Sequence, residues 1–351
     1  RPPPQHVIDK LCEVAGKPGA HGYSQSKGIP GLRRAQANYY GRRFNVDLDP
    51  EREVVVTMGS KEGLSSMATA ITAPGDVVLA PSPSYPIHTF GFIIAGATIR
   101  SVPTTPDEKY WQALDNAMAY TVPRPTVLVV NYPSNPTAET VDLAFYERLV
   151  AWAKENKVWV LSDLAYSELY YDGKPTRSIL EVPGAKGVAV EFTSMSKTYS
   201  MAGWRMGFAV GNPELIGALT RVKSYLDYGA FTPIQAAACA ALNGPQDIVE
   251  ENRARYQHRR DVMVEAFARA GWDIPSPPAS MFAWVPLPPG FHNVGSLEFS
   301  KQLLEHAGVA VAAGVGYGEE GEGFVRIAMV ENEQRIRQAA RNVKRFLAER
   351  G

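Results

Sequence analysis

The sequence has 351 residues, of which 45% are hydrophobic and 21% are charged, so the chain is long enough for a large core and a second, smaller domain. Lys and Arg together number 36, and Asp and Glu also number 36. This balance lacks the electrostatic bias that indicates nucleic acid or an anionic membrane as a partner. The longest apolar run, residues 90–99, is well short of the roughly 20 residues that a membrane-spanning helix needs. We therefore expect a soluble two-domain protein with a small neutral or zwitterionic ligand.

The cysteine content and the start of the chain bear on its cellular context. Cys12 and Cys239 are the only cysteines, which is too few for a disulfide framework and gives no spacing suited to zinc. We therefore expect the cytoplasm as the compartment. The sequence starts at Arg1 with neither an initiator methionine nor a signal-peptide pattern, and we expect an N-terminal piece to be missing.

Apolar, β-branched runs predict a series of strands, and helical periodicity separates several of them. The runs occupy residues 54–57, 77–80, 126–131, 158–162, 188–193 and 206–210. Between the first two, apolar residues recur at i, i+3, i+4 and i+7 from Leu64 to Ile71, which places one apolar face on a helix beginning near Ser60. This alternation predicts an α/β fold with a mostly parallel central sheet flanked by helices.

The pattern of expected helices and strands changes after about residue 244. We expect a charged helix around residues 250–270, strands at 282–285 and 324–328, and a last helix with an apolar face from Ile336 to Leu347. These features predict a smaller α+β domain at residues 251–351. A large domain at 46–250 and an N-terminal segment at 1–45 precede it.

The strongest chemical signal is the segment 193–205, which directly follows a predicted buried strand. It contains Lys197 close behind Ser194 and Ser196, with Arg205 eight residues further on. A lone lysine after a strand is usually a solvated loop residue. Here, serine hydroxyls and a guanidinium supply the hydrogen-bond donors of a phosphate cradle, next to an amine that can act as a nucleophile. One short segment therefore combines an amine with an anion site.

Two more polar residues follow the ends of predicted strands. Asn135 comes after the strand at 126–131, and Asp163 comes after the strand at 158–162. In open α/β sheets, ligands bind at the edge where the strands have their carboxyl ends. The alternative interpretations are a turn at Asn135 and Pro136 and a helix cap at Asp163. The residues alone leave both alternatives open.

Together these motifs resemble the class I/II aminotransferases, which belong to the fold-type I pyridoxal-phosphate-dependent enzymes. The resemblance extends from about residue 22 to the C-terminus. The matching elements, in family order, are Tyr23 with Gly28 and residues 32–33, residues 59–62, Tyr85 with Pro86, residues 135–137, 163–166 and 194–205, and Arg326. The chain most resembles bacterial alanine-forming, glutamate–pyruvate-type transaminases, through residues 196–199, 202–205, 331–332 and 335–338. Aspartate and LL-diaminopimelate aminotransferases remain alternatives.

The resemblance implies a ping-pong aminotransferase that carries pyridoxal 5'-phosphate as a Schiff base on Lys197. Once released from the cofactor, the Lys197 amine would act as the general base. Asp163 would keep the pyridine nitrogen of the cofactor protonated by direct opposite-charge interaction. Tyr166 and Asn135 would share the phenolic oxygen of the ring. Arg326, with Asn135, would clamp the α-carboxylate of the substrate, a task that suits the planar guanidinium.

The resemblance also implies how the phosphate and the ring are held. Ser194, Ser196 and Arg205 would bind the phosphate, together with backbone N–H groups near Ser60 and Lys61 at a helix N-terminus. Tyr85 would stack on the ring. Tyr23 would reach the phosphate of the partner subunit, which implies a homodimer with shared active sites, and residues 1–45 would contribute to the dimer contacts and the small domain. A packed loop residue is the alternative for Tyr85, and a surface arginine for Arg326.

Other patterns limit these expectations. Ala138 and Ala313 stand where family members often have Gly and Pro, which bears on loop shape and substrate fit. The glycine-rich segment 314–318 precedes no helix long enough for a dinucleotide site. Candidate cations for a dicarboxylic substrate are Lys27, Arg33 and Lys61, whereas His88 has no companions for a metal site.

A pyridoxal-phosphate-dependent C–S lyase and a ligand-sensing regulator with an added DNA-binding module are the competing functions.

Overall fold

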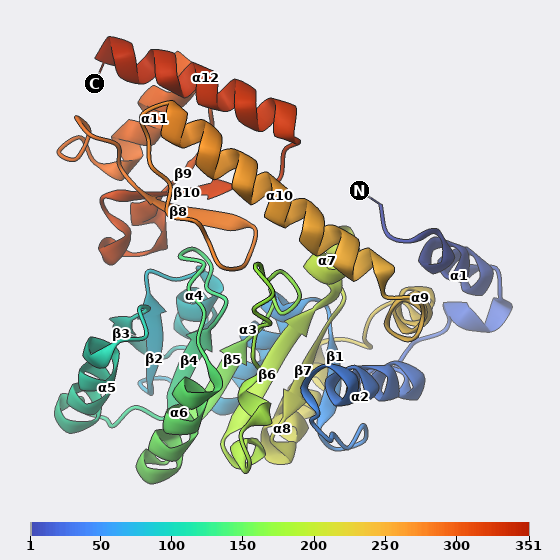
Figure 1. Ribbon diagram of the computed structural model, residues 1–351. Helices are drawn as coiled ribbons and strands as arrows, with labels where there is room; N and C mark the ends of the chain where they lie inside the picture. The colour runs from blue at the N-terminus through green and yellow to red at the C-terminus, as the bar shows by residue number, and fades with distance from the viewer. Residues whose placement is uncertain (1, 351) are drawn as a thin grey trace.

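Two β-sheets organise residues 2–350, the part of the chain that the computed structural model describes (Figure 1). A seven-stranded sheet has the order β1-β7-β6-β5-β4-β2-β3, and a three-stranded sheet has the order β8-β10-β9. The long helix α10 (Asp247–Arg269) runs from the side of the larger sheet to the smaller one, as Figure 1 shows. Each sheet therefore forms the centre of its own part of the molecule.

The larger sheet confirms the predicted strands to within two residues. Its strands are β1 (Val54–Thr57), β2 (Val77–Ser82), β3 (Thr98–Pro103), β4 (Val127–Asn131), β5 (Trp159–Asp163), β6 (Ala189–Ser194) and β7 (Gly207–Gly211). All pairings are parallel except those of β7, which is antiparallel to both β1 and β6. The edge strand β3 was not predicted, because only Val102 in it is buried and its sequence lacks an apolar run.

Helices cover both faces of the larger sheet. One face packs against α3 (Ser60–Ile71), α4 (Ile87–Ile94) and α8 (Pro213–Leu226), through apolar residues such as Leu64 and Leu219. The other face contributes to a second core that includes Tyr40 and Tyr146. The helices that supply this core are α1 (Gln5–Ala15), α2 (Pro30–Phe44), α5 (Glu108–Tyr120), α6 (Leu143–Asn156) and α9 (Thr232–Asn243). The predicted helix near Ser60 is confirmed as α3.

The smaller sheet has a separate core. Its strands are β8 (Phe282–Pro286), β9 (Ala312–Ala313) and β10 (Phe324–Ala328), and α10, α11 (Ser296–Ala307) and α12 (Glu333–Arg350) pack around them. Rings of Phe299, Trp272, Phe291 and Phe346 meet in this core. The predicted α/β fold with a smaller C-terminal α+β part is confirmed. The boundaries at residues 45 and 250 stay a prediction.

Within residues 2–350, no helix combines the length and the apolar character that crossing a bilayer requires. The same residues contain no group of three His, Cys, Asp or Glu side chains placed to hold a metal ion.

We expect Phe299→Ala to lower the free energy of unfolding by about 3–5 kcal/mol, because the change leaves a cavity where the aromatic rings of the smaller core meet. Leu297→Ala on the same helix is the matched control, since Leu297 is 55% exposed. It should change the free energy by no more than about 0.5 kcal/mol. Urea unfolding followed by circular dichroism measures both, and equal losses would contradict the assignment of the core.

Candidate active site

The predicted site residues converge at the carboxyl-terminal edge of the larger sheet. There they line one pocket with a volume of about 300 Å³. The predicted residues that line it are Ser60, Lys61, Tyr85, Asn135, Asp163, Tyr166, Ser194, Ser196, Lys197, Arg205 and Arg326, joined by Asn131, Ala165, Ala202 and Phe282. Segments far apart in the sequence thus meet at the edge that the strand order predicts for a ligand.

Lys197 lies on the short helix α7 (Met195–Thr198), which follows β6 without a break. Its side chain is partly buried in the pocket. Burial, and then the positive charges of Arg205 and Arg326, lower the pKa of the Lys197 amine. An amine with a lowered pKa is more often neutral, and a neutral amine is the form that attacks a carbonyl or accepts a proton.

Asp163 ends β5 and is 4% exposed. Its Oδ2 lies 2.8 Å from Nε2 of His88, and its Oδ1 accepts the backbone N–H of Ala165 at 3.2 Å. The side-chain amide of Asn131 donates to the backbone oxygen of Asp163 at 2.9 Å. These contacts hold a buried carboxylate in a fixed orientation, in the pocket that contains Lys197.

His88 is a site residue that the sequence analysis missed. It is fully buried on α4, three residues after Tyr85, and its Nδ1 has no hydrogen-bond partner among residues 2–350. Its contact with Asp163 spans 75 positions of sequence. The spacing from Tyr85 is the only local signal for His88, which contacts a carboxylate of the pocket and belongs to no group of metal ligands among the described residues.

Tyr166 is buried beside Asp163. Burial, and then the negative charge of Asp163, raise the pKa of the Tyr166 phenol. The hydroxyl therefore stays protonated and can donate a hydrogen bond into the pocket. The ring of Tyr166 packs edge-on against Phe282 of the smaller sheet, with 5.8 Å between the centroids.

Arg326 connects the smaller sheet to the larger one. Its Nη1 donates to Oδ1 of Asn135 at 2.8 Å, across 191 positions of sequence. The guanidinium carbon lies 3.8 Å from the ring centroid of Phe282 and 5.0 Å from that of Tyr317. The buried Nε has no hydrogen-bond partner among the described residues. A carboxylate ligand would satisfy this donor, since two parallel N–H···O bonds fit the guanidinium.

A cradle for an anion forms around the N-terminus of α3. No side chain caps this helix, which leaves backbone N–H groups of its first turn for an anion. Gly59, with φ +83°, lets Arg205 approach, because a Cβ there would lie 2.3 Å from Nη2 of Arg205. Gly207 is equally constrained, since its Cβ would lie 2.9 Å from the backbone nitrogen of Ser60. The residues present therefore fit a phosphate-bearing cofactor.

The remaining polar groups complete the cradle and one wall of the pocket. Ser194 caps α7 by accepting the N–H of Ser196 at 3.1 Å. On the α3 side, Nζ of Lys61 lies 5.6 Å from the ring centroid of Tyr85. Both Lys61 and Tyr85 line the pocket, although they lie far in the sequence from the segment 193–205 that contains Lys197.

Tyr23 is the predicted site residue that the chain does not bring into the pocket. It is 88% exposed and packs on Tyr228, with 4.4 Å between the ring centroids. Two of the three suggested cations are also elsewhere, because Lys27 and Arg33 pair with Glu51 at 3.4 and 3.0 Å. Lys61 is therefore the suggested cation that lines the pocket.

The departures at Ala138 and Ala313 have local consequences. Ala138 is buried with φ +63°, the left-handed conformation that glycine adopts at lower cost. Ala313 lies in β9, and the glycine-rich segment after it forms the short 3-10 helix Gly314–Tyr317. A Cβ on Gly314 would lie 2.0 Å from the backbone oxygen of Gly321, so this glycine serves close packing of the backbone.

The chain belongs to the family described as aminotransferase class I and II, whose model matches residues 1–343. The chain is an aminotransferase. Aminotransferases of this family depend on pyridoxal phosphate, use amino acids and 2-oxo acids, and are commonly dimeric.

Individual relatives match along almost the whole chain. A putative aminotransferase, AatC, from Rhizobium meliloti (strain 1021) is 63% identical over 99% of this chain and 86% of its own length. The glutamate–pyruvate aminotransferase AlaC from Escherichia coli (strain K12) is 50% identical over 97% of this chain and 83% of its own length. Several LL-diaminopimelate aminotransferases are also similar. The substrate-bound structure of BacF from Bacillus subtilis superimposes with a TM-score of 0.91 at 34% identity, covering 98% of this chain and 87% of that one.

We expect Arg326→Gln to shift the pKa of Lys197 upward, because it removes a positive charge that lowers this pKa. Arg326→Lys is the matched control, since it keeps the charge and should leave the pKa nearer that of the unchanged chain. The measurement is the pH profile for Schiff-base formation between the cofactor-free protein and pyridoxal phosphate. The midpoint should move to higher pH in the Gln variant, and an equal shift in both variants would contradict an electrostatic cause.

Proposed function

We propose that Lys197 carries pyridoxal 5'-phosphate as a Schiff base, and that the chain exchanges an amino group between an alanine- or glutamate-type amino acid and a 2-oxo acid by a ping-pong mechanism. The supporting observation is that a lysine with a lowered pKa, a buried carboxylate and an anion cradle share one pocket. When bound, the cofactor supplies an electron sink for the carbon that loses its proton.

The chain's own residues divide the remaining work. Asp163, oriented by His88 and Ala165, places a negative charge for the ring nitrogen. Tyr166 donates to the phenolic oxygen, a role supported by the raised pKa of its phenol. Lys197, once its amine is free, would accept the proton from the substrate Cα and deliver it to the cofactor carbon that carried the Schiff base. The lowered pKa of this amine supports that role, because it makes the neutral, proton-accepting form more frequent.

Binding of the substrate and of the phosphate depends on different walls of the pocket. Arg326, held by Asn135 and packed on Phe282, binds the α-carboxylate. Asn135 also shares the phenolic oxygen with Tyr166, while Tyr85 stacks on the ring. The phosphate is held by Ser60 and Lys61 through backbone N–H groups, and by Ser194, Ser196 and Arg205.

We also propose a homodimer with shared active sites. Tyr23 is exposed and packs on Tyr228, and the exposed apolar residues Tyr225, Leu226 and Phe231 are close to Tyr228 along the chain. Exposed apolar side chains that gather on a surface mark protein–protein contacts. In the dimer, Tyr23 reaches the phosphate of the partner subunit, and residues 1–45 contribute to the contact.

The two free cysteines are compatible with the cytoplasm as the compartment.

The central test is Lys197→Ala in the chain loaded with pyridoxal phosphate. The visible absorption band of the Schiff base should be absent, and amino transfer should fall by at least about 10²–10⁴-fold, the usual contribution of a general base. Lys27→Ala serves as the control, since Lys27 pairs with Glu51 outside the pocket. Normal transfer by the Lys197 variant would sink the proposal. Pyruvate and ammonia from cysteine-type substrates, with no transfer to 2-oxoglutarate, would instead indicate a C–S lyase.

Lys61 supports a substrate with a second carboxylate, because its amine lines the pocket and has no carboxylate within 4.0 Å in the described part of the chain. We expect Lys61→Ala to lower kcat/KM for glutamate by about 10–100-fold, the worth of one charge-assisted hydrogen bond. The value for alanine should change little, since alanine has no second carboxylate. The backbone N–H for the phosphate remains in this variant.

Steady-state kinetics with both donors checks this prediction, with Lys27→Ala as the control. Equal losses for alanine and glutamate would show that Lys61 acts on the cofactor and not on the substrate side chain. Aspartate and LL-diaminopimelate belong in the same panel, because the corresponding enzymes are the alternatives within the family.

A further inference from the structure

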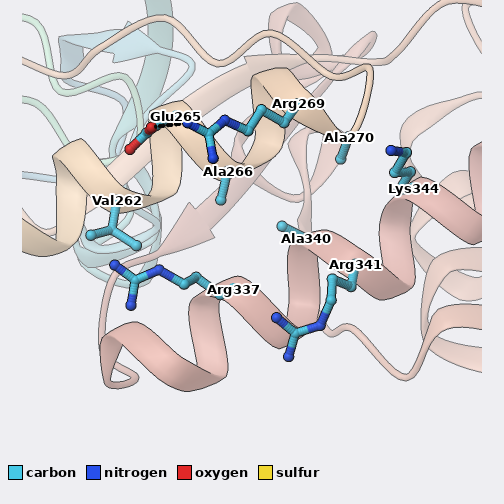
Figure 2. Close-up of a pocket in the computed structure, with 9 residues that line it drawn as sticks. All are labelled: Val262, Glu265, Ala266, Arg269, Ala270, Arg337, Ala340, Arg341 and Lys344. Carbon is cyan, nitrogen blue, oxygen red and sulfur yellow. Dashed lines mark hydrogen bonds and ion pairs between the residues drawn. The ribbon is translucent and has the colours of Figure 1, made fainter.

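A groove of about 250 Å³ lies between α10 and α12, on the outside of the smaller core (Figure 2). None of its lining residues lines the pocket around Lys197. Figure 2 shows four basic side chains bordering the groove, Arg269 from α10 and Arg337, Arg341 and Lys344 from α12. The groove is therefore a basic feature that the aminotransferase reaction does not use.

In the described part of the chain, the basic side chains that α12 contributes to the groove have no acidic partner. Arg269 pairs with Glu265, the one carboxylate that lines the groove. Arg341 donates to the neutral amide oxygen of Gln338 at 2.6 Å. Within residues 2–350, Arg337 and Lys344 have no ion-pair or hydrogen-bond partner. The groove thus has a surplus of positive charge, although the whole chain has 36 basic and 36 acidic residues.

The placement of these charges is unfavourable for an isolated helix. Arg337 and Arg341 are four positions apart, so their like charges lie on adjacent turns of one face. Arg335 and Arg337 lie near the N-terminus of α12, where the helix dipole favours negative charge. A bound anion would relieve both effects. Arg335, Arg337 and Arg341 also line an adjoining pocket with Asn332, Gln334 and Gln338.

Small side chains leave room between the two helices. Ala266 of α10 and Ala270, the residue directly after α10, face Ala340 of α12 in the groove, with Val262 beside them. Arg337 and Lys344 are seven positions apart, which corresponds to about 10 Å along a helix axis. Basic groups of α12 thus border the groove in a row, with small apolar side chains between the two helices. A linear anion with several charges fits this row.

We propose that this groove binds a small anion with two or more linked phosphate groups, either free polyphosphate or the phosphate chain of a nucleotide. Arginine favours phosphate because the guanidinium donates two parallel hydrogen bonds to its oxygens. Lys344 adds a flexible point charge at the far end of the row. This site is independent of the proposed function, because no residue that holds the cofactor or the substrate belongs to it.

The test is isothermal titration calorimetry of the pyridoxal-phosphate-saturated protein with inorganic tripolyphosphate, at a low ionic strength of about 20 mM, where charges are weakly screened. Binding should weaken by at least about tenfold in the double variant Arg337→Ala with Lys344→Ala, which removes two charged donors. The matched control is Lys301→Ala with Arg345→Ala, which removes two exposed charges outside the groove. It should bind within about twofold of the unchanged chain.

Thermal melting of each variant establishes that it is folded. ATP and adenosine form the second arm: tighter binding of ATP than of tripolyphosphate, lost in the groove variant, identifies a nucleotide, and equal binding identifies free polyphosphate. The proposal is overturned if tripolyphosphate gives no heat of binding, or if both double variants lose affinity equally. Tighter binding of polyglutamate at the same residues also overturns it, in favour of an acidic protein segment.

Discussion

The hydrogen bond between Arg326 and Asn135 is the contact on which the pocket depends. It joins a strand of the smaller sheet to the loop after β4 of the larger sheet, at 2.8 Å and across 191 positions of sequence. Together with the packing of Phe282 on Tyr166, it places a wall from the smaller sheet opposite the lysine and the carboxylate at the edge of the larger sheet. With it, the proposed carboxylate clamp lies in the same space as Lys197, and its positive charge contributes to lowering the pKa of that amine.

The pocket is lined by more positively than negatively charged side chains. Four basic side chains, Lys61, Lys197, Arg205 and Arg326, line the same space as one carboxylate, that of Asp163. Such an arrangement is costly when empty, because like charges repel in a partly buried site. A phosphate and one or two carboxylates would compensate it. Burial is the main cause of the lowered pKa of Lys197, and Arg205 and Arg326, two of the charges that prepare the pocket for anionic ligands, lower it further.

The sequence predicted six of the seven strands of the larger sheet, and eleven of the twelve predicted site residues line the pocket, because strand ends and the segment around Lys197 are local patterns. It did not predict β3, whose residues are mostly polar or partly exposed, nor His88, whose partner Asp163 is 75 positions away. The sequence alone also could not show which candidate cation lies in the pocket. Arg33 and Lys61 are equally plausible in the sequence, and the ion pair of Arg33 with Glu51 shows that Arg33 lies elsewhere. Tyr23 faces outward, as a residue that acts in a partner subunit would.

Two of the connections between the parts of the molecule differ in strength. At the base of α10, the buried carboxylate of Glu168 accepts from Arg253 at 3.0 Å, from Arg43 at 2.9 Å and from Tyr39 at 2.6 Å. Removing one partner of such a buried network is strongly destabilising. At the pocket, Arg326 holds Asn135 through one hydrogen bond. The network at the base of α10 is therefore the more fixed of the two, and its Glu168 comes two residues after Tyr166. The contact at Arg326 rests on one hydrogen bond and would cost less to rearrange when the proposed carboxylate binds.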